Sequence, residues 1–166
     1  MPAQGTPAID VVRRAGVPFE VLTYESPEHH GRERDARPAY GLEAAGALGV
    51  EPARMFKTLV AVADDRLVSA LVPVDRELDL KRLAVAVGAR RAALADPAVA
   101  ERATGYVVGG ISPLGGRRAM PTVIDRSVEA FESVLVSAGR RGLQLALAPA
   151  DLVRLTAATV AEIARP

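Results

Sequence analysis

The chain has 166 residues, of which 49% are hydrophobic and only 4% aromatic, and its formal net charge is +1. This length fits one domain over residues 1–166, with a core built mainly from small and branched aliphatic side chains. The lack of cysteine excludes disulfides, thiolate nucleophiles and cysteine-ligated metals. No apolar run approaches the roughly 18 residues that span a bilayer, and the N-terminus has no signal-peptide pattern, so we expect a cytoplasmic protein with no membrane partner.

The first 24 residues predict a helix followed by a strand. Thr6 has the residue type of an N-cap, Pro7 fits the first helical position, and Gly16 marks the end of the helix. Residues 19–24 alternate well enough between apolar and polar to indicate a strand. Tyr24 lies at its end, where it either presents its hydroxyl to a cleft or is a half-buried aromatic at a rim.

Residues 25–38 are almost wholly polar and contain both histidines, His29 and His30. Neighbouring residues on an extended chain point in opposite directions, and no third strong ligand has helical spacing, so we expect no metal site here. We expect a mobile loop instead. It acts either as a flap beside a pocket or as a tolerated insertion.

The next segments place a lysine inside an apolar strand. A short Ala-rich helix is predicted at 42–48 and a turn at 51–55, followed by a strand at 56–63. Lys57 is the anomaly in this strand, because burial of an unpaired ammonium is costly. It therefore either extends to solvent from a sheet edge or lines a cleft, where it meets an anionic or carbonyl ligand.

The rest of the chain alternates strands and helices. The predicted elements are a hairpin turn at 64–65, strand 67–74, helix 79–87, strand 89–94, helix 96–104, strand 121–125, a helical turn at 127–131, strands 133–137 and 143–147, and one or two helices over 149–164. This order, with hairpin-like spacing between several strands, indicates an α/β or α+β domain with a mixed sheet.

Residues 105–116 read GYVVGGISPLGG and predict a strand at 106–108 that breaks into a glycine loop. Glycine lets the backbone approach a ligand closely and Pro113 stiffens the loop, so its amides suit an anion or a carbonyl oxygen. The glycine spacing resembles a P-loop, but Gly116-Arg117 stands where that motif requires Lys-Ser/Thr. The other interpretation is a tight connection between two strands.

Basic residues occur as doublets, although the net charge is close to zero. The doublets are Arg13-Arg14, Lys81-Arg82, Arg90-Arg91, Arg117-Arg118 and Arg140-Arg141. They form either a local basic rim that binds phosphates or ordinary solvated surface. Neither a G-x-S-x-G elbow nor an H-E-x-x-H helix is present, so an enzyme of this sequence must work largely through electrostatics, positioning and the substrate itself.

Three ordered motifs resemble the YbaK/EbsC family of aminoacyl-tRNA deacylases. They are FKTL from residue 56, GYVVGGISPLG from residue 105 and VSAGRRGL from residue 136, and the resemblance runs from Thr6 almost to the C-terminus. It implies a curved, mostly antiparallel sheet with helices packed around it, and no cofactor. It also implies removal of amino acids from mischarged tRNA, most typically cysteine from the tRNA specific for proline, by free-standing editors that work behind prolyl-tRNA synthetase.

For cysteine-specific members the resemblance implies a substrate-assisted reaction, in which the cysteine thiol attacks its own ester carbonyl, expels the terminal ribose and leaves a thiolactone. The protein supplies a small pocket, stabilisation of the oxyanion and contacts to the terminal adenosine. The implied catalytic residues are Lys57, Gly109 and Gly110. The implied substrate-binding residues are Tyr24, Tyr40, Thr58, Ile111, Ser112 and Ser137, and the implied tRNA-binding residues are Arg140 and Arg141.

Gln144 departs from the resembled pattern, because many relatives carry an acidic or small polar residue there. Related subfamilies remove alanine or other small amino acids with water, and a methyl-sized difference is worth only about 1 to 3 kcal/mol in binding. Alanine and serine therefore stand beside cysteine as candidate substrates. Two other classes stay open: a non-catalytic module that binds tRNA or a synthetase, and a hydrolase of another small acyl ester.

Overall fold

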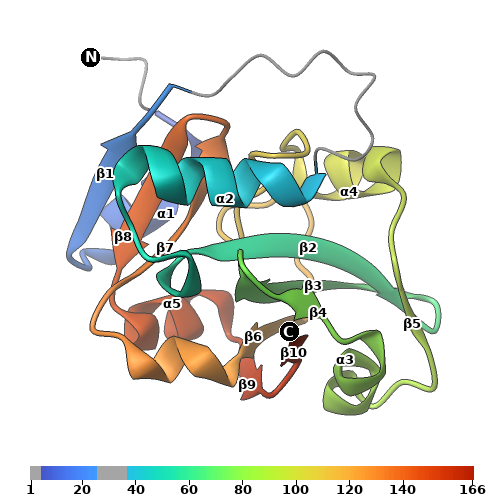
Figure 1. The fold of residues 1–166 in the computed structure, drawn as a ribbon. Helices are drawn as coiled ribbons and strands as arrows, with labels where there is room; N and C mark the ends of the chain where they lie inside the picture. The colour runs from blue at the N-terminus through green and yellow to red at the C-terminus, as the bar shows by residue number, and fades with distance from the viewer. Residues whose placement is uncertain (1–4, 26–36) are drawn as a thin grey trace.

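The computed structural model describes residues 5–25 and 37–166 (Figure 1). The helices are α1 (Pro7–Ala15), α2 (Arg37–Leu48), α3 (Leu80–Val87), α4 (Pro97–Thr104) and α5 (Pro149–Thr156), with two 3₁₀ turns at Pro52–Arg54 and Arg126–Ala130. The strands are β1 (Phe19–Thr23), β2 (Phe56–Ala63), β3 (Arg66–Pro73), β4 (Glu77–Leu78), β5 (Ala92–Leu94), β6 (Thr122–Asp125), β7 (Val134–Arg140), β8 (Leu143–Leu147), β9 (Thr159–Ala161) and β10 (Ala164–Arg165).

Within the described residues the strands form three sheets. An antiparallel sheet has the order β1-β8-β7, and β4 pairs with β10. The largest sheet has the order β5-β2-β3-β6-β9, in which β6 runs parallel to both neighbours and the other pairs are antiparallel. A parallel bridge between Met55 and Leu135 joins the start of β2 to β7. The expected α/β fold with a mixed, mostly antiparallel set of strands and surrounding helices is confirmed, although the strands are divided among separate sheets.

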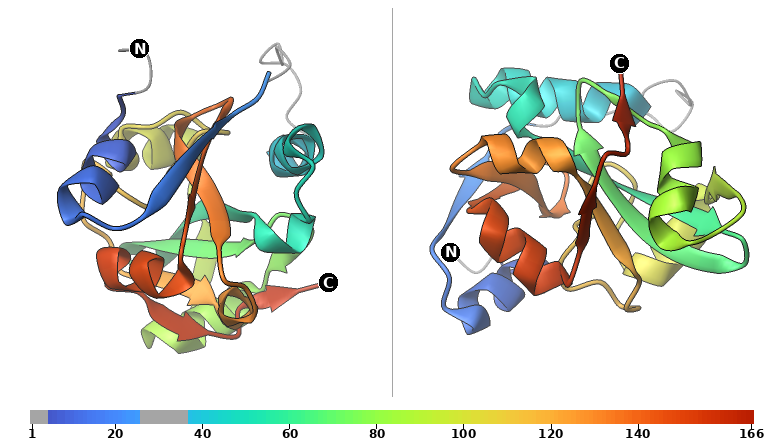
Figure 2. Two further views of the ribbon diagram at one scale, coloured as in Figure 1. Left: turned by 90° about the vertical axis from the view of Figure 1, so that its left-hand side faces the viewer. Right: turned by 90° about the horizontal axis from the view of Figure 1, so that it is seen from below.

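The main core lies between the two larger sheets. Val136 of β7 and Leu145 of β8 are buried there in one cluster with Phe56 of β2 and Ile124 of β6. Successive residues of a strand point to opposite faces of its sheet, so the residues that alternate with these core residues face the outer helices. On the outer face of the five-stranded sheet α3 packs with Leu83, and on that of the three-stranded sheet α2 packs with Ala44 and Ala45. Figure 2 shows α1 and α2 on opposite sides of the three-stranded sheet.

The first helix has the caps that its sequence predicts. The Thr6 hydroxyl accepts a hydrogen bond from the amide of Ile9 at 3.1 Å, and Gly16 ends α1 with a φ of +72°. The same hydroxyl donates to the carbonyl of Ala138 at 2.5 Å. This N-cap therefore also attaches α1 to β7.

Two predicted elements are wrong. Residues 106–108 form no strand, because turns and side chains bind their backbone: the amide of Tyr106 donates to the Thr104 hydroxyl at 3.1 Å and that of Val108 to the Glu101 carboxylate at 2.8 Å. The C-terminal segment is not one or two helices over 149–164. Only α5 is helical, and the chain then forms β9 beside β6 and β10 beside β4.

The polar segment expected at 25–38 is shorter than predicted at its C-terminal side, because α2 already begins at Arg37. Pro38 is compatible with this start, since amides in the first turn of a helix have no intrahelical partner. Residues 26–36, which include His29 and His30, lie outside the described residues. In the described part of the chain, no helix is both long and apolar enough to cross a membrane.

Candidate active site

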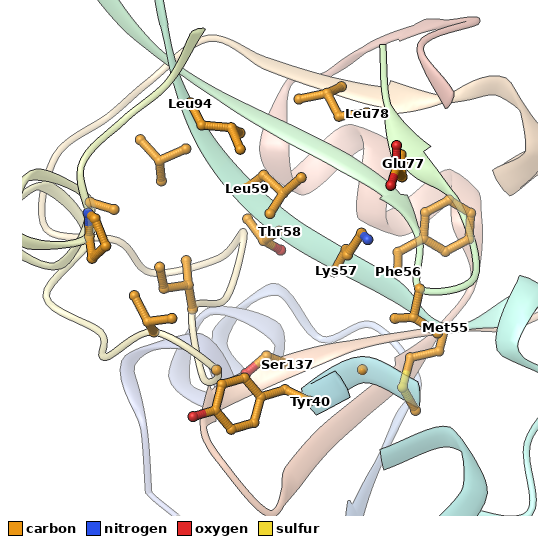
Figure 3. A pocket seen from close by; sticks show the side chains of 18 of the residues that line it. Tyr40, Met55, Phe56, Lys57, Thr58, Leu59, Glu77, Leu78, Leu94 and Ser137 are labelled. Carbon is orange, nitrogen blue, oxygen red and sulfur yellow. The ribbon is translucent and has the colours of Figure 1, made fainter. Parts of the chain in front are cut away.

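A cavity of about 440 Å³ lies beside β2 and forms the candidate active site. Its walls come from segments far apart in the sequence: the residue after β1, the start of α2, β2, β4, β10, α4, the glycine loop and the β7–β8 pair. Figure 3 shows side chains of α2, β2, β4 and β7 that converge on it.

The cavity lies along the first half of β2, where one edge of the strand pairs with no other named strand among the described residues. Strand β3 pairs with the whole length of β2, whereas β5 pairs only with residues 61–63. The carbonyl of Met55 accepts from the amide of Val74 on the β3 side, and the carbonyl of Val60 accepts from Ala95 on the opposite side. Because bonding direction alternates along an antiparallel strand, the amide and carbonyl of Thr58 point away from β3. They therefore face the open edge beside the cavity.

Lys57 lines this cavity, as the cleft interpretation of the sequence predicts. Burial lowers the pKa of its ammonium, and the negative charges of Glu77 and Asp75 offset part of that effect. Figure 3 shows the ammonium pointing toward Glu77, whose carboxylate forms a 3.0 Å ion pair with Arg165. Among the described residues, no hydrogen bond or ion pair within contact distance holds the Lys57 ammonium. A cation in this state suits a carbonyl or anionic ligand.

Neutral polar side chains occupy the other side of β2. Ser137 and Gln144 lie opposite each other on β7 and β8, and both line the cavity with Thr58. The Thr58 hydroxyl oxygen and the Gln144 amide oxygen are buried and have no hydrogen-bond partner among the described residues. An unpaired buried polar group costs about 1–3 kcal/mol, so these two oxygens mark a place for polar groups of a ligand.

The remaining walls are aromatic and aliphatic. Tyr24 and Tyr40 both line the cavity, so the cleft interpretation of Tyr24 agrees with the structure. The lining also includes the aliphatic residues Leu59, Leu78, Leu80, Leu94, Pro97 and Ala100. The cavity therefore combines a few polar groups with a large apolar surface.

The glycine loop meets the cavity through Val108, Gly109 and Ile111. Gly110 does not line the cavity but packs against the turn between β7 and β8, where an added Cβ would lie 2.6 Å from Cα of Arg140. The backbone of Gly109 has a φ of +92°, a conformation that favours glycine. The loop is thus a backbone wall, as the sequence predicts, with Gly109 at the cavity and Gly110 behind it.

Three other residues implied by the resemblance lie outside the cavity lining. Ser112 is only 3% exposed, and its hydroxyl accepts a hydrogen bond from the amide of Leu114, so it shapes the loop. Arg140 is exposed in the turn after Ser137. The Arg141 guanidinium donates two hydrogen bonds to the carbonyl of Val108 and lies over the ring of Tyr40.

Sequence reasoning missed the wall formed by β4 and β10. Glu77, Leu78 and Arg165 line the cavity, and Arg165 lies beside Glu77 because β10 pairs with β4. The two strands have two residues each and no local pattern distinguishes them. The sequence does contain an acidic residue, Glu77, 20 residues after Lys57. Its place beside Lys57 can be recognised only when the pairing of the strands is known.

Comparisons with known proteins identify the family of this chain. Residues 37–155 match the family of aminoacyl-tRNA editing domains. A protein of Enterococcus faecalis with the provisional name Cys-tRNA(Pro)/Cys-tRNA(Cys) deacylase EbsC is 35% identical over 161 residues, which cover 96% of this chain and 93% of that protein. The Escherichia coli protein named multifunctional Ser/Thr-tRNA deacylase ProXp-y is 34% identical over 89 residues, 53% of each chain. A crystal structure provisionally described as a trans-editing enzyme for prolyl-tRNA synthetase has a TM-score of 0.80 at 24% identity and covers 98% of this chain and 99% of that one.

The chain therefore belongs to the aminoacyl-tRNA editing domain family. The expected enzyme class, a hydrolase of the ester bond in aminoacyl-tRNA, is confirmed by this membership, and the expected fold is confirmed by the structural match.

Proposed function

We propose that this protein removes cysteine from mischarged tRNA specific for proline, as a free-standing editor that works behind prolyl-tRNA synthetase. The observation that carries this proposal is the Lys57 ammonium, which lies without an ion-pair contact among the described residues, in a cavity with unpartnered polar oxygens and an open strand edge. The full-length similarity to the Enterococcus faecalis protein supports cysteine as the amino acid.

The roles of the cavity residues follow from their positions. The Lys57 ammonium orients the aminoacyl-adenosine through an oxygen of the ester or ribose, because it has no competing partner within contact distance among the described residues. The open edge at Thr58 offers one amide and one carbonyl to the substrate backbone. The loop at Gly109 and Ile111 holds the carbonyl or a ribose hydroxyl from the other side.

The aromatic walls select for a small amino acid. Tyr24 and Tyr40 line the cavity beside the polar region that contains Ser137. A cysteine side chain fits such a space, and its thiol then attacks the neighbouring ester carbonyl. The bond to the ribose oxygen breaks, the thiol proton passes to that oxygen, and a thiolactone leaves. No nucleophile from the protein is needed for this step, in agreement with the absence of cysteine from the chain.

The basic turn between β7 and β8 is the proposed contact to tRNA phosphate. Arg140 is exposed there, and Arg141 is the next residue of the same turn. We assign phosphate contacts to both residues. Phosphate contacts of this kind add affinity that weakens as salt concentration rises.

Serine is a second candidate substrate, and Gln144 favours it. Its unpartnered amide oxygen is an acceptor, and a hydroxyl donates a stronger hydrogen bond than a thiol does. The similarity to the Escherichia coli Ser/Thr-tRNA deacylase points the same way. Since serine lacks the nucleophilic thiol, its removal requires water as the attacking group.

The test is release of amino acid from proline tRNA charged with Cys, Ala, Ser or Pro. Three proteins are compared: wild type, Lys57→Ala and Lys81→Ala. Lys81→Ala is the control, because Lys81 is an exposed lysine on α3. Selective release of cysteine that is lost only in Lys57→Ala supports the proposal. Release of serine or alanine changes the substrate but keeps the class, and equal activity of Lys57→Ala and wild type contradicts the role of Lys57. Binding without release indicates a non-catalytic module, whereas turnover of free aminoacyl esters without tRNA indicates a hydrolase of small esters.

A further inference from the structure

Both polar groups of Val108 are bound by charged side chains. Its amide donates to Oε2 of Glu101 at 2.8 Å, and its carbonyl accepts from Nε and Nη2 of Arg141 at 3.0 and 2.7 Å. Hydrogen bonds to ionised groups are shorter and about twice as strong as neutral ones. The peptide that precedes Gly109 is therefore fixed from two sides, at the point where the glycine loop enters the cavity.

The same guanidinium contacts a second wall of the cavity. Its central carbon lies 4.5 Å from the centroid of the Tyr40 ring, within the range of a cation–π contact. Tyr40 belongs to α2 and Val108 to the loop after α4, and both line the cavity. Arg141 is thus the described side chain that joins these two walls directly.

The β7–β8 turn is shaped to bring Arg141 to this place. Ser137 pairs with Gln144, but Arg140 pairs with Leu143, so the register shifts by a bulge within β7. The glycine loop presses closely on this turn, since a Cβ added at Gly109 would lie 2.6 Å from Nε of Arg141. A bulge commonly redirects a side chain in this manner.

We propose that Arg141 is a positioning residue for the deacylation reaction: it fixes the Val108–Gly109 peptide and the Tyr40 ring around the substrate. This proposal rests on the proposed function. Fixed backbone dipoles accelerate a reaction because they need no reorganisation when charge develops. Only a guanidinium offers two N–H groups to one carbonyl together with a flat face for an aromatic ring, so lysine does not replace it.

The kinetic test compares Arg141→Lys with Arg14→Lys, which makes the same change at an exposed residue of α1. A displacement of about 1 Å at a reacting centre costs up to 10²-fold, so we expect kcat for Arg141→Lys to fall by roughly 10- to 100-fold. We expect KM for charged tRNA, and its dependence on salt, to change little. If Arg141 acts only as a phosphate contact, Arg141→Lys keeps kcat, Arg141→Ala raises KM, and the salt slope falls by about one. That result overturns the proposal.

A second variant guards against a general effect of Arg141→Lys on folding. Glu101→Gln weakens the bond to the amide of Val108 and leaves Arg141 in place. We expect kcat to fall in this variant too, by a smaller factor and again with little change in KM. Unchanged kcat in Glu101→Gln, together with lost secondary structure in Arg141→Lys, contradicts the proposal.

Hydrogen exchange of the amides at 107–111 tests the positioning without any activity. We expect faster exchange there in Arg141→Lys and Glu101→Gln, and wild-type exchange in Arg14→Lys. Unchanged exchange in both loop variants overturns the proposal even if kcat falls. If wild type releases no amino acid from any charged tRNA, the proposed function fails, and the exchange data still decide whether Arg141 fixes the loop.

Discussion

Ser137 and Gln144 face each other across the β7–β8 pair, but their polar groups are in different states. The Ser137 hydroxyl accepts a hydrogen bond from the amide of Gly139 at 3.2 Å, whereas the amide oxygen of Gln144 is buried without a partner among the described residues. The hydrogen bond to the Ser137 hydroxyl stabilises the bulge of β7, whereas the unpaired oxygen of Gln144 destabilises the folded chain. Because Gln144 also lines the cavity, a bound substrate can supply the missing partner.

Gln144→Leu is therefore expected to change stability and activity in opposite directions. Leucine removes the unpaired oxygen at similar size, so the free energy of unfolding should rise by about 1 kcal/mol. The substrate loses a hydrogen-bond partner, so kcat/KM should fall at least tenfold, a loss of about 1.4 kcal/mol in transition-state binding. Urea denaturation and deacylation of charged tRNA measure the two quantities. A more stable variant with wild-type kcat/KM would show that the substrate does not use Gln144.

Gly110→Ala tests the contact between the glycine loop and the β7–β8 turn. The added Cβ meets the backbone of Arg140 at 2.6 Å, and backbone cannot move away as a side-chain tip does. We expect the free energy of unfolding to fall by about 1–3 kcal/mol and activity to be largely lost. The control is Gly46→Ala on the exposed side of α2, where a Cβ has no neighbour within 4 Å. Removal of a helical glycine there should raise stability by about 0.5–1 kcal/mol, and equal effects of the two changes would contradict the packing argument.

The sequence predicts best the parts of the fold that depend on local chemistry. The N-cap at Thr6, the turn at 64–65 and strand β8 all follow from nearby residues, and the structure has each of them. Asp64 illustrates why: it adopts a φ of +56° in the turn, a conformation that aspartate adopts more readily than most residues other than glycine. Lys57 could be identified because an ammonium in an apolar strand is costly without a function.

The errors concern backbone whose hydrogen-bond partners are distant or are side chains. Residues 106–108 have the composition of a strand, but Glu101 and Arg141 bind the polar groups of Val108, and a neighbouring strand does not. Strand β10 has its partner, β4, about 87 residues earlier in the chain. No sequence window contains both members of such a pair. For the same reason, the sequence alone does not identify Glu77 and Arg165 as cavity residues.

Asp125→Asn tests the contact that holds this C-terminal wall. The Asp125 carboxylate is 3% exposed and accepts hydrogen bonds from the amides of Ile163 and Ala164, both at 2.9 Å. Hydrogen bonds to a charged group are worth about 1.5–3 kcal/mol, so we expect a loss of this size in the free energy of unfolding at neutral pH. Urea denaturation measures it, and the exposed Asp65→Asn serves as the control.

The effect of Asp125 should depend on pH. Burial by itself raises the pKa of this carboxyl, but the hydrogen bonds from Ser127, Ile163 and Ala164 outweigh burial and hold the pKa below its ordinary value. The stabilisation is then present above the unfolded pKa of about 3.9 and is lost as pH falls through the folded pKa. The difference between wild type and Asp125→Asn should therefore shrink in acid. A difference that stays constant down to strongly acidic pH would exclude this origin.

Glu77 is expected to set the pH range in which Lys57 acts. Burial lowers the pKa of Lys57, and the Glu77 carboxylate raises it. Glu77→Gln removes the raising influence, so the ammonium should lose its proton at lower pH and the alkaline limb of kcat/KM should move to lower pH. Arg165→Ala removes a positive charge that pairs with Glu77 at 3.0 Å, so it should move the same limb to higher pH.

The measurement is the pH profile of deacylation, corrected for spontaneous ester hydrolysis, with the exposed Glu129→Gln as the control. Because the two variants are expected to shift in opposite directions, a shared shift or no shift would show that Lys57 does not act as an ammonium whose charge Glu77 supports.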